Sequence, residues 1–228
     1  MALASLAARY GLERHQREQL GALLEVLAQD ERAPTAVRGP EAVEVHVADS
    51  LVALELEVVR TAGTIADVGA GAGFPGLALA VAMAGSKVRL VESQRRRCLF
   101  LRDVLAKVGI ENACVVCTRA EDWRDGARQH DVVAARAVAG QPVVLEYAAP
   151  LLRLGGTLVD WRGKRLQAEE HAAARAAAEL GLRLVEVRRV EPFKGARDHH
   201  LHLYQKVSDT PARFPRRAGM ARKRPIGG

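Results

Sequence analysis

Residues 65–76 read Ile-Ala-Asp-Val-Gly-Ala-Gly-Ala-Gly-Phe-Pro-Gly and decide the fold of this chain. A short apolar run ends in Asp67, glycines follow at every second position, and apolar residues resume after Pro75. This pattern predicts a strand, a tight turn and the start of a helix. Glycines let a ligand approach the backbone closely, and the first amides of a helix have no intrahelical partner. We therefore expect a polar ligand above this turn.

Two ligand motifs overlap in these residues. The segment from Gly71 to Gly76 fits the G-x-G-x-x-G pattern of dinucleotide sites, whereas Asp67 to Gly73 fits the D-x-G-x-G-x-G loop of S-adenosylmethionine-dependent methyltransferases. A glycine pattern alone is weak evidence for either ligand. Asp67 favours the second, because a carboxylate before the turn repels a pyrophosphate and suits an ammonium or sulfonium group.

The length and charge of the chain restrict its class. The 228 residues are 49% hydrophobic and fit one sizeable α/β domain with a modest extension. A net charge of +7 and a pI near 9.8 suit a polyanionic partner such as nucleic acid. No apolar run approaches the ~20 residues that span a bilayer, and the start does not resemble a secretion signal. We expect a soluble, cytoplasmic protein with no membrane association.

The three cysteines fit a reducing compartment. Cys114 and Cys117 form a C-x-x-C pattern, but they lie in a predicted strand, where residues three apart point to opposite faces. We therefore expect neither a disulfide nor metal chelation between them, and we interpret these two cysteines as core residues.

The hydrophobic periodicity indicates three regions. Residues 1–60 predict an N-terminal helical extension, with helices near 12–28 and 41–59. Residues 61–208 alternate strands with helices, and the strands are expected at 65–68, 87–92, 112–119, 130–136, 157–163, 182–190 and 200–207. Residues 209–228 form a basic tail rich in proline and glycine, for which we expect disorder in the free protein.

The last two predicted strands follow each other without a helix, which indicates a hairpin with an antiparallel last strand. The expected fold is therefore α/β, with a seven-stranded doubly wound sheet. Such a closing hairpin is typical of the Rossmann-like class I methyltransferase sheet and not of the six-stranded dehydrogenase sheet.

Several single residues gain a candidate role from their position. Glu92 ends the second strand about 20 residues after the glycine loop, where an acid meets the hydroxyls of a bound ribose, and Ser93 follows it. Arg136 ends the fourth strand, at the edge where open α/β sheets bind ligands, although a surface salt bridge remains an alternative. Trp123 either contacts an adenine ring or packs as a core aromatic. His46 either takes part in the site or merely packs.

A set of motifs spread over nearly the whole chain resembles one known family. They are His46-x-x-Asp49-Ser50-Leu51, the block from Asp67 to Gly76, Glu92-Ser93 with Phe100-Leu101-Arg102, Arg119-Ala120-Glu121, Arg136-Ala137, Pro150-Leu151-Leu152-x-x-Gly155-Gly156, and the basic tail from Phe214 to Pro225. Through them the chain resembles the RsmG family, also called glucose-inhibited division protein B, of bacterial 16S ribosomal RNA guanine-N7 methyltransferases.

This resemblance implies S-adenosylmethionine as the cofactor and the 16S RNA, free or in the 30S subunit or its assembly intermediates, as the partner. The implied cofactor residues are Asp67, Gly69, Gly71, Gly73, Phe74, Glu92, Ser93, Ala120, Glu121 and Arg136. The implied positioning residues are Arg136 and Arg162, with no general base, because guanine N7 carries a free lone pair. We expect no metal site, since no histidine and carboxylate cluster has ligand spacing, and we expect a monomer.

The substrate side departs from the family pattern. The family tends to have lysine where Arg162 precedes Gly163, and arginine where His199 stands; Arg197 is a candidate substitute. The residues expected to bind RNA are Arg197, His199, Arg216, Arg217, Arg222, Lys223 and Arg224. We expect that deleting residues beyond Thr210 weakens RNA binding and leaves cofactor binding intact.

Two other functions remain open at this stage. A non-catalytic RNA-binding or ribosome assembly protein on a methyltransferase scaffold would keep the same residues. A nicotinamide-dependent dehydrogenase would share the glycine loop, but it would not explain Asp67, the closing hairpin or the basic tail.

Overall fold

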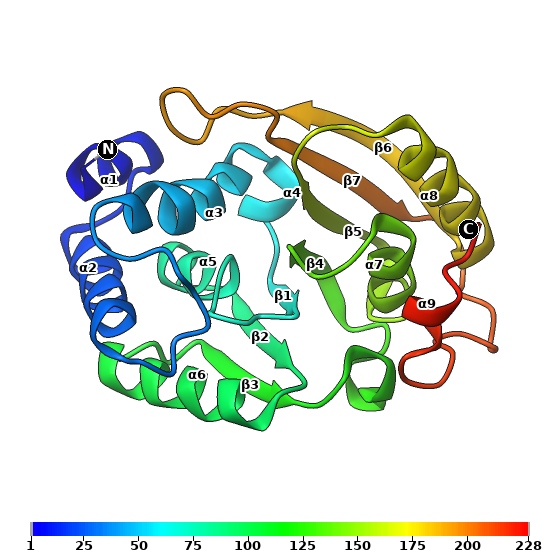
Figure 1. Cartoon of the computed structure of the whole chain (residues 1–228), viewed down its shortest axis with the longest axis horizontal. Helices are drawn as coiled ribbons and strands as arrows, with labels where there is room; N and C mark the ends of the chain where they lie inside the picture. The colour runs from blue at the N-terminus through cyan, green and yellow to red at the C-terminus, as the bar shows by residue number, and fades with distance from the viewer. Residues whose placement is uncertain (1, 228) are drawn as a thin grey trace.

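A computed structural model describes residues 2–227, and within them the strands form one seven-stranded sheet (Figure 1). The strands are β1 (Thr64–Val68), β2 (Lys87–Glu92), β3 (Ala113–Cys117), β4 (His130–Arg136), β5 (Leu152–Arg162), β6 (Leu182–Arg189) and β7 (His200–Lys206). Their order across the sheet is β3-β2-β1-β4-β5-β7-β6. Strand β7 runs antiparallel to β5 and β6, whereas β1 to β5 pair in parallel. The predicted doubly wound sheet with an antiparallel last strand is confirmed.

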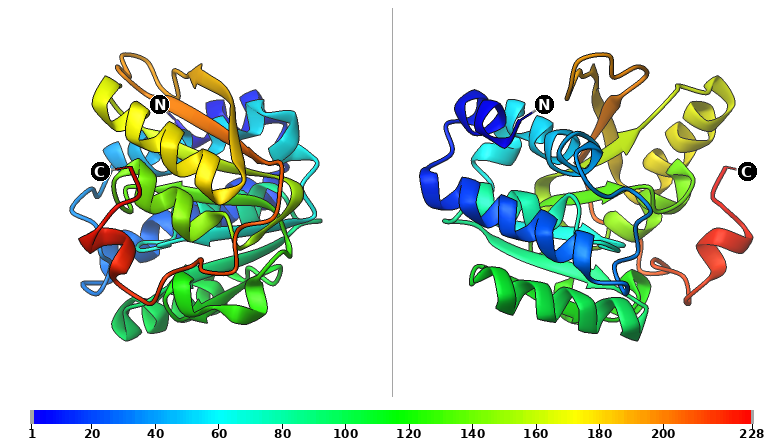
Figure 2. Two further views of the ribbon diagram at one scale, coloured as in Figure 1. Left: turned by 90° about the vertical axis from the view of Figure 1, so that its right-hand side faces the viewer. Right: turned by 60° about the vertical axis from the view of Figure 1, so that its left-hand side comes forward.

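Helices cover both faces of this sheet, and each face has its own apolar core. Successive residues of a strand point to opposite faces, so Ile65 joins one core and Ala66 the other. Helices α5 (Gly76–Ala82) and α6 (Arg95–Val108) lie on the first face, and α7 (Gln141–Ala148) and α8 (Gln167–Leu180) lie on the second (Figure 2). The carboxyl ends of β1 to β4 thus lie between the two helical layers.

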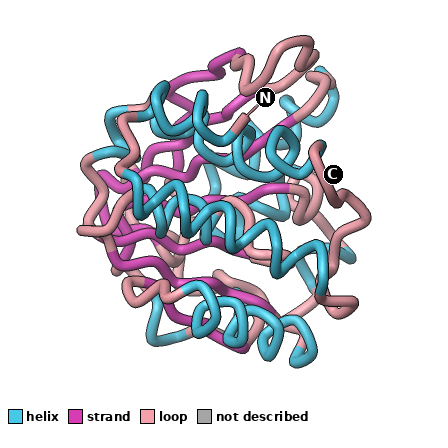
Figure 3. Tube along the Cα trace, turned by 90° about the vertical axis from the view of Figure 1, so that its left-hand side faces the viewer, coloured by secondary structure: helices cyan, strands magenta, loops and turns pink. Residues whose placement is uncertain are grey.

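The N-terminal extension adds a further helical layer over α5 and α6. Helices α1 (Leu3–Tyr10) and α2 (Arg14–Gln29) lie there, as Figure 3 shows from their side. The single helix predicted over 41–59 is wrong. The chain forms instead a π-helical turn (Val43–Ala48), α3 (Asp49–Leu51), a 3₁₀ turn (Val52–Glu55) and α4 (Glu57–Arg60). Ser50 Oγ donates to His46 O at 2.5 Å, and Leu56 has extended backbone angles that end the 3₁₀ turn.

Strand β5 begins earlier than the sequence predicts. The sequence predicts the strand from residue 157, but β5 begins at Leu152 and contains residues 155–156, and α7 ends at Ala148. The pairing of β4 with β5 shifts register between His130 and Val132. A side chain on Gly156 would come within 2.8 Å of His130 O. The two glycines therefore accommodate an irregularity in the ladder and do not end it.

The basic tail also differs from the expectation of disorder. Phe214, Ala221 and Ile226 are buried in the core formed with α7 and α8. Ala221 belongs to the short helix α9 (Met220–Lys223). Arg216 pairs with Glu146, whose carboxylate on α7 is completely buried. Apolar anchors and a buried ion pair therefore hold this segment against the second helical face.

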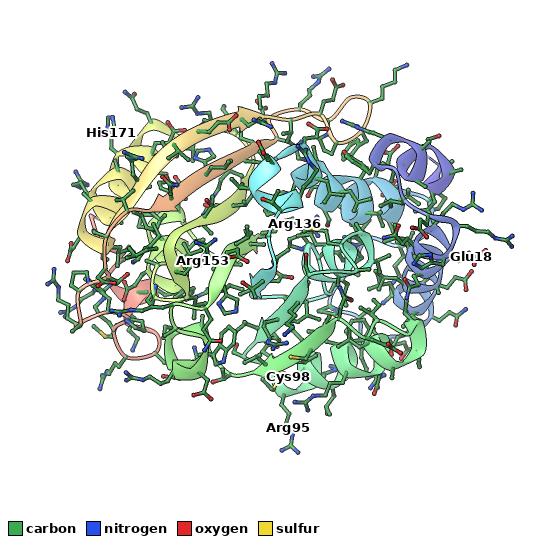
Figure 4. All side chains as sticks on the ribbon, turned by 180° about the vertical axis from the view of Figure 1, so that it is seen from behind. Glu18, Arg95, Cys98, Arg136, Arg153 and His171 are labelled. Carbon is green, nitrogen blue, oxygen red and sulfur yellow. A yellow bond between two sulfur atoms is a disulfide. The ribbon has the colours of Figure 1, made fainter. Side chains whose placement is uncertain are left out.

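The cysteines are not all core residues. Cys98 on α6 is buried and forms a disulfide with Cys117 at the end of β3, with the two Cα atoms 5.7 Å apart (Figure 4). Cys117 and Cys114 are exposed, because β3 is an edge strand, and Arg89 donates to the Cys114 sulfur. The interpretation of Cys114 and Cys117 as core residues is therefore wrong. None of the helices in the described part of the chain is long and apolar enough to cross a membrane.

Candidate active site

The glycine loop after β1 crosses the carboxyl edge of the sheet. Gly69 and Gly73 have positive φ angles of 75° and 98°, which glycine adopts without strain. A Cβ atom at Gly69 would stand 2.9 Å from Val138 Cγ2, and one at Gly73 would stand 2.1 Å from Leu77 Cδ1. The loop therefore lies directly against its neighbours and leaves its backbone facing the edge of the sheet.

Asp67 lies beneath this loop and holds the start of α5. Its Oδ2 accepts a hydrogen bond from the Gly76 amide at 2.9 Å, and the residue is 1% exposed. Burial raises the pKa of Asp67 to about 7. The carboxyl group thus fixes the turn from below, and it does not line the cavity described next.

Glu92 joins the glycine loop to the end of β2. One carboxylate oxygen, Oε2, accepts from the Gly71 amide at 3.1 Å, and the other, Oε1, accepts from the Gln94 amide at 2.8 Å. The side chain is buried, and Arg97 Nη1 lies 3.7 Å from Oε2. This carboxylate therefore forms a fixed anionic wall, as expected for an acid that accepts from ribose hydroxyls.

A cavity of about 170 Å³ opens beside Glu92, at the carboxyl ends of β1 to β4. Five of the predicted cofactor residues line it: Gly69, Glu92, Ser93, Ala120 and Glu121. The other five, Asp67, Gly71, Gly73, Phe74 and Arg136, do not line it. Gly71 still helps to position the cavity wall, because its amide donates a hydrogen bond to the lining residue Glu92.

Ten further lining residues were not predicted as cofactor residues. Among them are Val138 after β4, Tyr147 on α7 and Arg222 on α9, and the sequence placed Arg222 with the RNA-binding residues. Trp123, in contrast, is not in this cavity. Its ring packs 5.1 Å from the His130 ring, so the reading as a packing aromatic agrees with the structure.

Arg136 stands at the centre of a second cluster, next to the glycine loop (Figure 4). Its Nη1 donates to Asp49 Oδ2 at 2.7 Å and to Val45 O at 2.8 Å, and its guanidinium carbon lies 5.9 Å from the centre of the Phe74 ring. The side chains of Arg136 and Asp49 are 17% and 11% exposed, so the pair is not a surface salt bridge.

Phe74 connects this cluster to the π-helical turn. The His46 ring stacks on Phe74 with centroids 4.8 Å apart, and His46 Nε2 lies 3.0 Å from Thr35 Oγ1. Burial, followed by the charge of Arg136, lowers the pKa of His46, which favours a neutral ring. His46 therefore packs within the site, where parts of three motifs of the family resemblance, those with His46, Phe74 and Arg136, meet in space.

Arg162 lies on β5, next to the strand that carries Arg136. Its Nε donates to Asp160 Oδ2 at 2.7 Å and its Nη1 to Glu169 Oε1 at 3.3 Å, whereas Nη2 is buried without a partner among the described residues. Burial raises the pKa of Asp160 to about 6. Trp161, paired with Arg136 across the strands, donates from Nε1 to Asp49 O at 2.8 Å. Arg136 and Arg162 therefore both lie at the carboxyl ends of neighbouring parallel strands.

Two of the substrate-side candidates, Arg197 and His199, lie on the loop between β6 and β7. Arg197 is exposed, and His199 packs edge-on against Phe193 at 5.7 Å. His200 Nδ1 lies 3.0 Å from Gly163 O, which ties this loop to the end of β5. The loop thus stands beside Arg162 and away from the cavity. Within residues 2–227, no three His, Cys, Asp or Glu residues are grouped as metal ligands would be.

The same fold occurs in solved methyltransferase structures. A SAM-dependent methyltransferase from Aquifex aeolicus superposes with a TM-score of 0.59 at 17% identity, over 74% of this chain and 94% of that one. The cofactor-bound protein Rv0187 from MTB gives a TM-score of 0.59 at 18% identity, over 90% and 96% of the two chains. At these identities the likeness shows the fold alone.

The fold, the glycine loop with its positive φ angles and the buried acid that ends β2 define an S-adenosylmethionine-dependent methyltransferase. The family model for GidB, rRNA small subunit methyltransferase G, matches residues 17–201. A ribosomal RNA small subunit methyltransferase G from Rubrobacter xylanophilus is 40% identical over 93% of this chain and 85% of its own. One from Thermotoga neapolitana is 36% identical over 98% of both chains. The chain belongs to the rRNA small subunit methyltransferase G family.

Proposed function

We propose that the chain methylates N7 of a guanine in the 16S RNA of the small ribosomal subunit. The observation that carries this proposal is the cavity between Gly69 and Glu92, which stands next to the Arg136 cluster in a chain of this family. On this proposal the protein acts as a cytoplasmic monomer, on the free RNA or on the assembling 30S subunit.

The residues of the cavity fit S-adenosylmethionine. A Cβ atom at Gly69 would clash with Val138, so a glycine is needed for these two residues to stand together in the cavity wall. Glu92 presents a fixed carboxylate to ribose hydroxyls, while Ala120 and Glu121 form the next part of the wall. The cofactor supplies a methyl group on a cationic sulfur, and the buried carboxylates favour a cation there.

The acceptor chemistry requires groups that align the base and does not require a general base. Guanine N7 attacks through an in-plane lone pair, so no proton has to be removed first. The protein must align the base and exclude water, and alignment is capable of offsetting roughly 7–11 kcal/mol of a barrier. Arg136 is already held by Asp49 and Val45, and Arg162 by Asp160 and Glu169, so both present their charge in a fixed position.

Labelled methyl transfer from S-adenosylmethionine to 16S RNA and to 30S particles tests this function. We expect transfer to one of these substrates by the wild type. Arg136→Ala should lower the turnover number at least about tenfold, because an aligned guanidinium is lost. It should also lower stability, since Asp49 loses its partner.

A matched control is Arg153→Ala. Arg153 pairs with Asp131 at 2.5 Å, but it is more exposed, and Asp131 lies at the start of β4 whereas Arg136 lies at its end. We expect normal turnover from the control. Normal turnover by Arg136→Ala, measured well below its melting temperature, would contradict the assigned role. Tight cofactor binding without transfer to any form of the RNA would instead support a non-catalytic assembly protein.

A further inference from the structure

The C-terminal segment, residues 213–227, forms part of the cofactor cavity. Arg222 on α9 lines the cavity and donates from Nη2 to Val138 O at 2.9 Å. Val138 is the residue that packs against Gly69 of the glycine loop. The Gly219 amide donates to Glu121 Oε1 at 3.1 Å, and Glu121 is itself a lining residue. Two hydrogen bonds therefore tie this segment to the cavity wall.

Contacts outside the cavity fix where the segment lies. Arg216 donates from its backbone amide and from Nε to Glu146 Oε1, at 3.1 and 2.9 Å. Phe214, Ala221 and Ile226 are buried on either side of this ion pair. Figures 1 and 2 show the segment crossing α7 with α9 beside it. These contacts place the docked segment, and with it Arg222, against the cavity wall.

The other side of the same segment is cationic and open to solvent. Arg217, Lys223 and Arg224 are exposed, and none of the three forms an ion pair with another described residue. Unpaired exposed cations at adjacent positions fit a phosphate backbone, because they neutralise phosphates without first breaking internal ion pairs. One short segment thus carries Arg222, which lines the cofactor cavity, and further exposed cations that do not line it.

We propose that this segment is a shared wall, through which cofactor and RNA strengthen each other's binding. Arg222 closes the adenosyl end of the cavity beside Glu121, and the neighbouring cations bind RNA phosphates. Both ligands favour the position in which the segment is docked on α7, so each raises the affinity of the other by the same factor. The inference rests on the proposed function, and it replaces the expectation that deleting residues beyond Thr210 leaves cofactor binding intact.

A comparison of Arg222→Ala with Lys223→Ala tests the inference. The two residues are adjacent and lose the same charge, but only Arg222 lines the cavity. Calorimetry at fixed ionic strength gives the dissociation constant of S-adenosylmethionine, with and without saturating 16S RNA. Without RNA, we expect Arg222→Ala to weaken cofactor binding about tenfold, because a charged hydrogen-bonding group is lost. Lys223→Ala should leave that constant within about twofold and lower the salt slope of RNA binding by about one.

The coupling has its own readout. We expect wild-type protein to bind S-adenosylmethionine several-fold more tightly with RNA than without it, and Arg222→Ala to lose most of that gain. Equal cofactor affinity for the two variants, or a wild-type affinity that RNA does not change, would overturn the inference. If the wild type transfers methyl groups and still gives those results, the inference alone fails; if it neither binds the cofactor nor transfers methyl groups, the proposed function fails as well.

Discussion

Glu92→Gln tests how the cofactor cavity is built, because it changes charge without changing shape. The wild-type carboxylate holds the Gly71 amide with one oxygen and the Gln94 amide with the other. A glutamine side chain has one acceptor oxygen and an NH₂ group that only donates. One of the two backbone amides therefore loses its acceptor, and the ribose hydroxyls lose a charged partner.

The size of the effect follows from these two bonds. A hydrogen bond to a charged group contributes about 1.5–3 kcal/mol, so the loss of one predicts about 2 kcal/mol, or roughly thirtyfold in the dissociation constant of S-adenosylmethionine. The effect on the free energy of unfolding should be smaller, below about 1 kcal/mol, because the neutral amide is also less costly to bury than the carboxylate.

Calorimetric titration with S-adenosylmethionine measures the affinity, and urea denaturation measures the stability. Glu111→Gln makes the same chemical change at an exposed position outside the cavity. We expect that control to match the wild type in both measurements. Cofactor affinity within about threefold of wild type for a folded Glu92→Gln protein would refute the assigned role of Glu92.

Two further predictions concern stability. Arg216→Ala should lower the free energy of unfolding by about 3 kcal/mol, because it leaves the Glu146 carboxylate buried without its partner. Arg213 is the control, since the two side chains of its ion pair with Glu179 are 62% and 39% exposed, and Arg213→Ala should lower that free energy by less than about 1 kcal/mol. Equal losses for the two variants in urea denaturation would contradict this account. Burial raises the pKa of Asp67 from 3.8 to about 7, so its stabilising contribution is complete below the lower value and is lost as the pH rises to the upper one. Asp67→Asn keeps an acceptor for the Gly76 amide and should flatten the pH dependence of unfolding across that window; an unchanged slope would show that Asp67 does not titrate there.

The parts of the site that the sequence predicts correctly depend on local order. The strand, turn and helix around Gly69 follow from residues that are adjacent in the chain. Glu92 follows from its distance along a βαβ unit, in which the second strand lies beside the first. Both predictions therefore need no information about contacts between distant residues.

The parts that the sequence misses depend on contacts between distant residues. Arg222 reaches Val138 across 84 positions, and no periodicity in the basic tail indicates this contact. The tail is ordered by a few apolar residues at irregular spacing and by Glu146, whose burial the sequence does not reveal. Tyr147 reads as one more apolar residue of α7, although it lines the cavity.

Arg136 shows an intermediate case. Its place at the end of β4 predicts a role in the site, but its partner Asp49 lies 87 positions earlier, in a helix that the periodicity predicts as regular. The irregular turn there places Asp49 against the arginine. The position was therefore predictable, and the ion pair was not.

The central claim is that this chain methylates N7 of one guanine in the 16S RNA. Labelled methyl transfer to 16S RNA and to 30S particles, followed by strand cleavage specific for N7-methylguanine, tests it most directly. We predict cleavage at a single guanosine with the wild type and a strongly reduced signal with Glu92→Gln at limiting cofactor. Incorporation of label without N7-specific cleavage, or no incorporation into either substrate by protein that binds the cofactor, would contradict the claim.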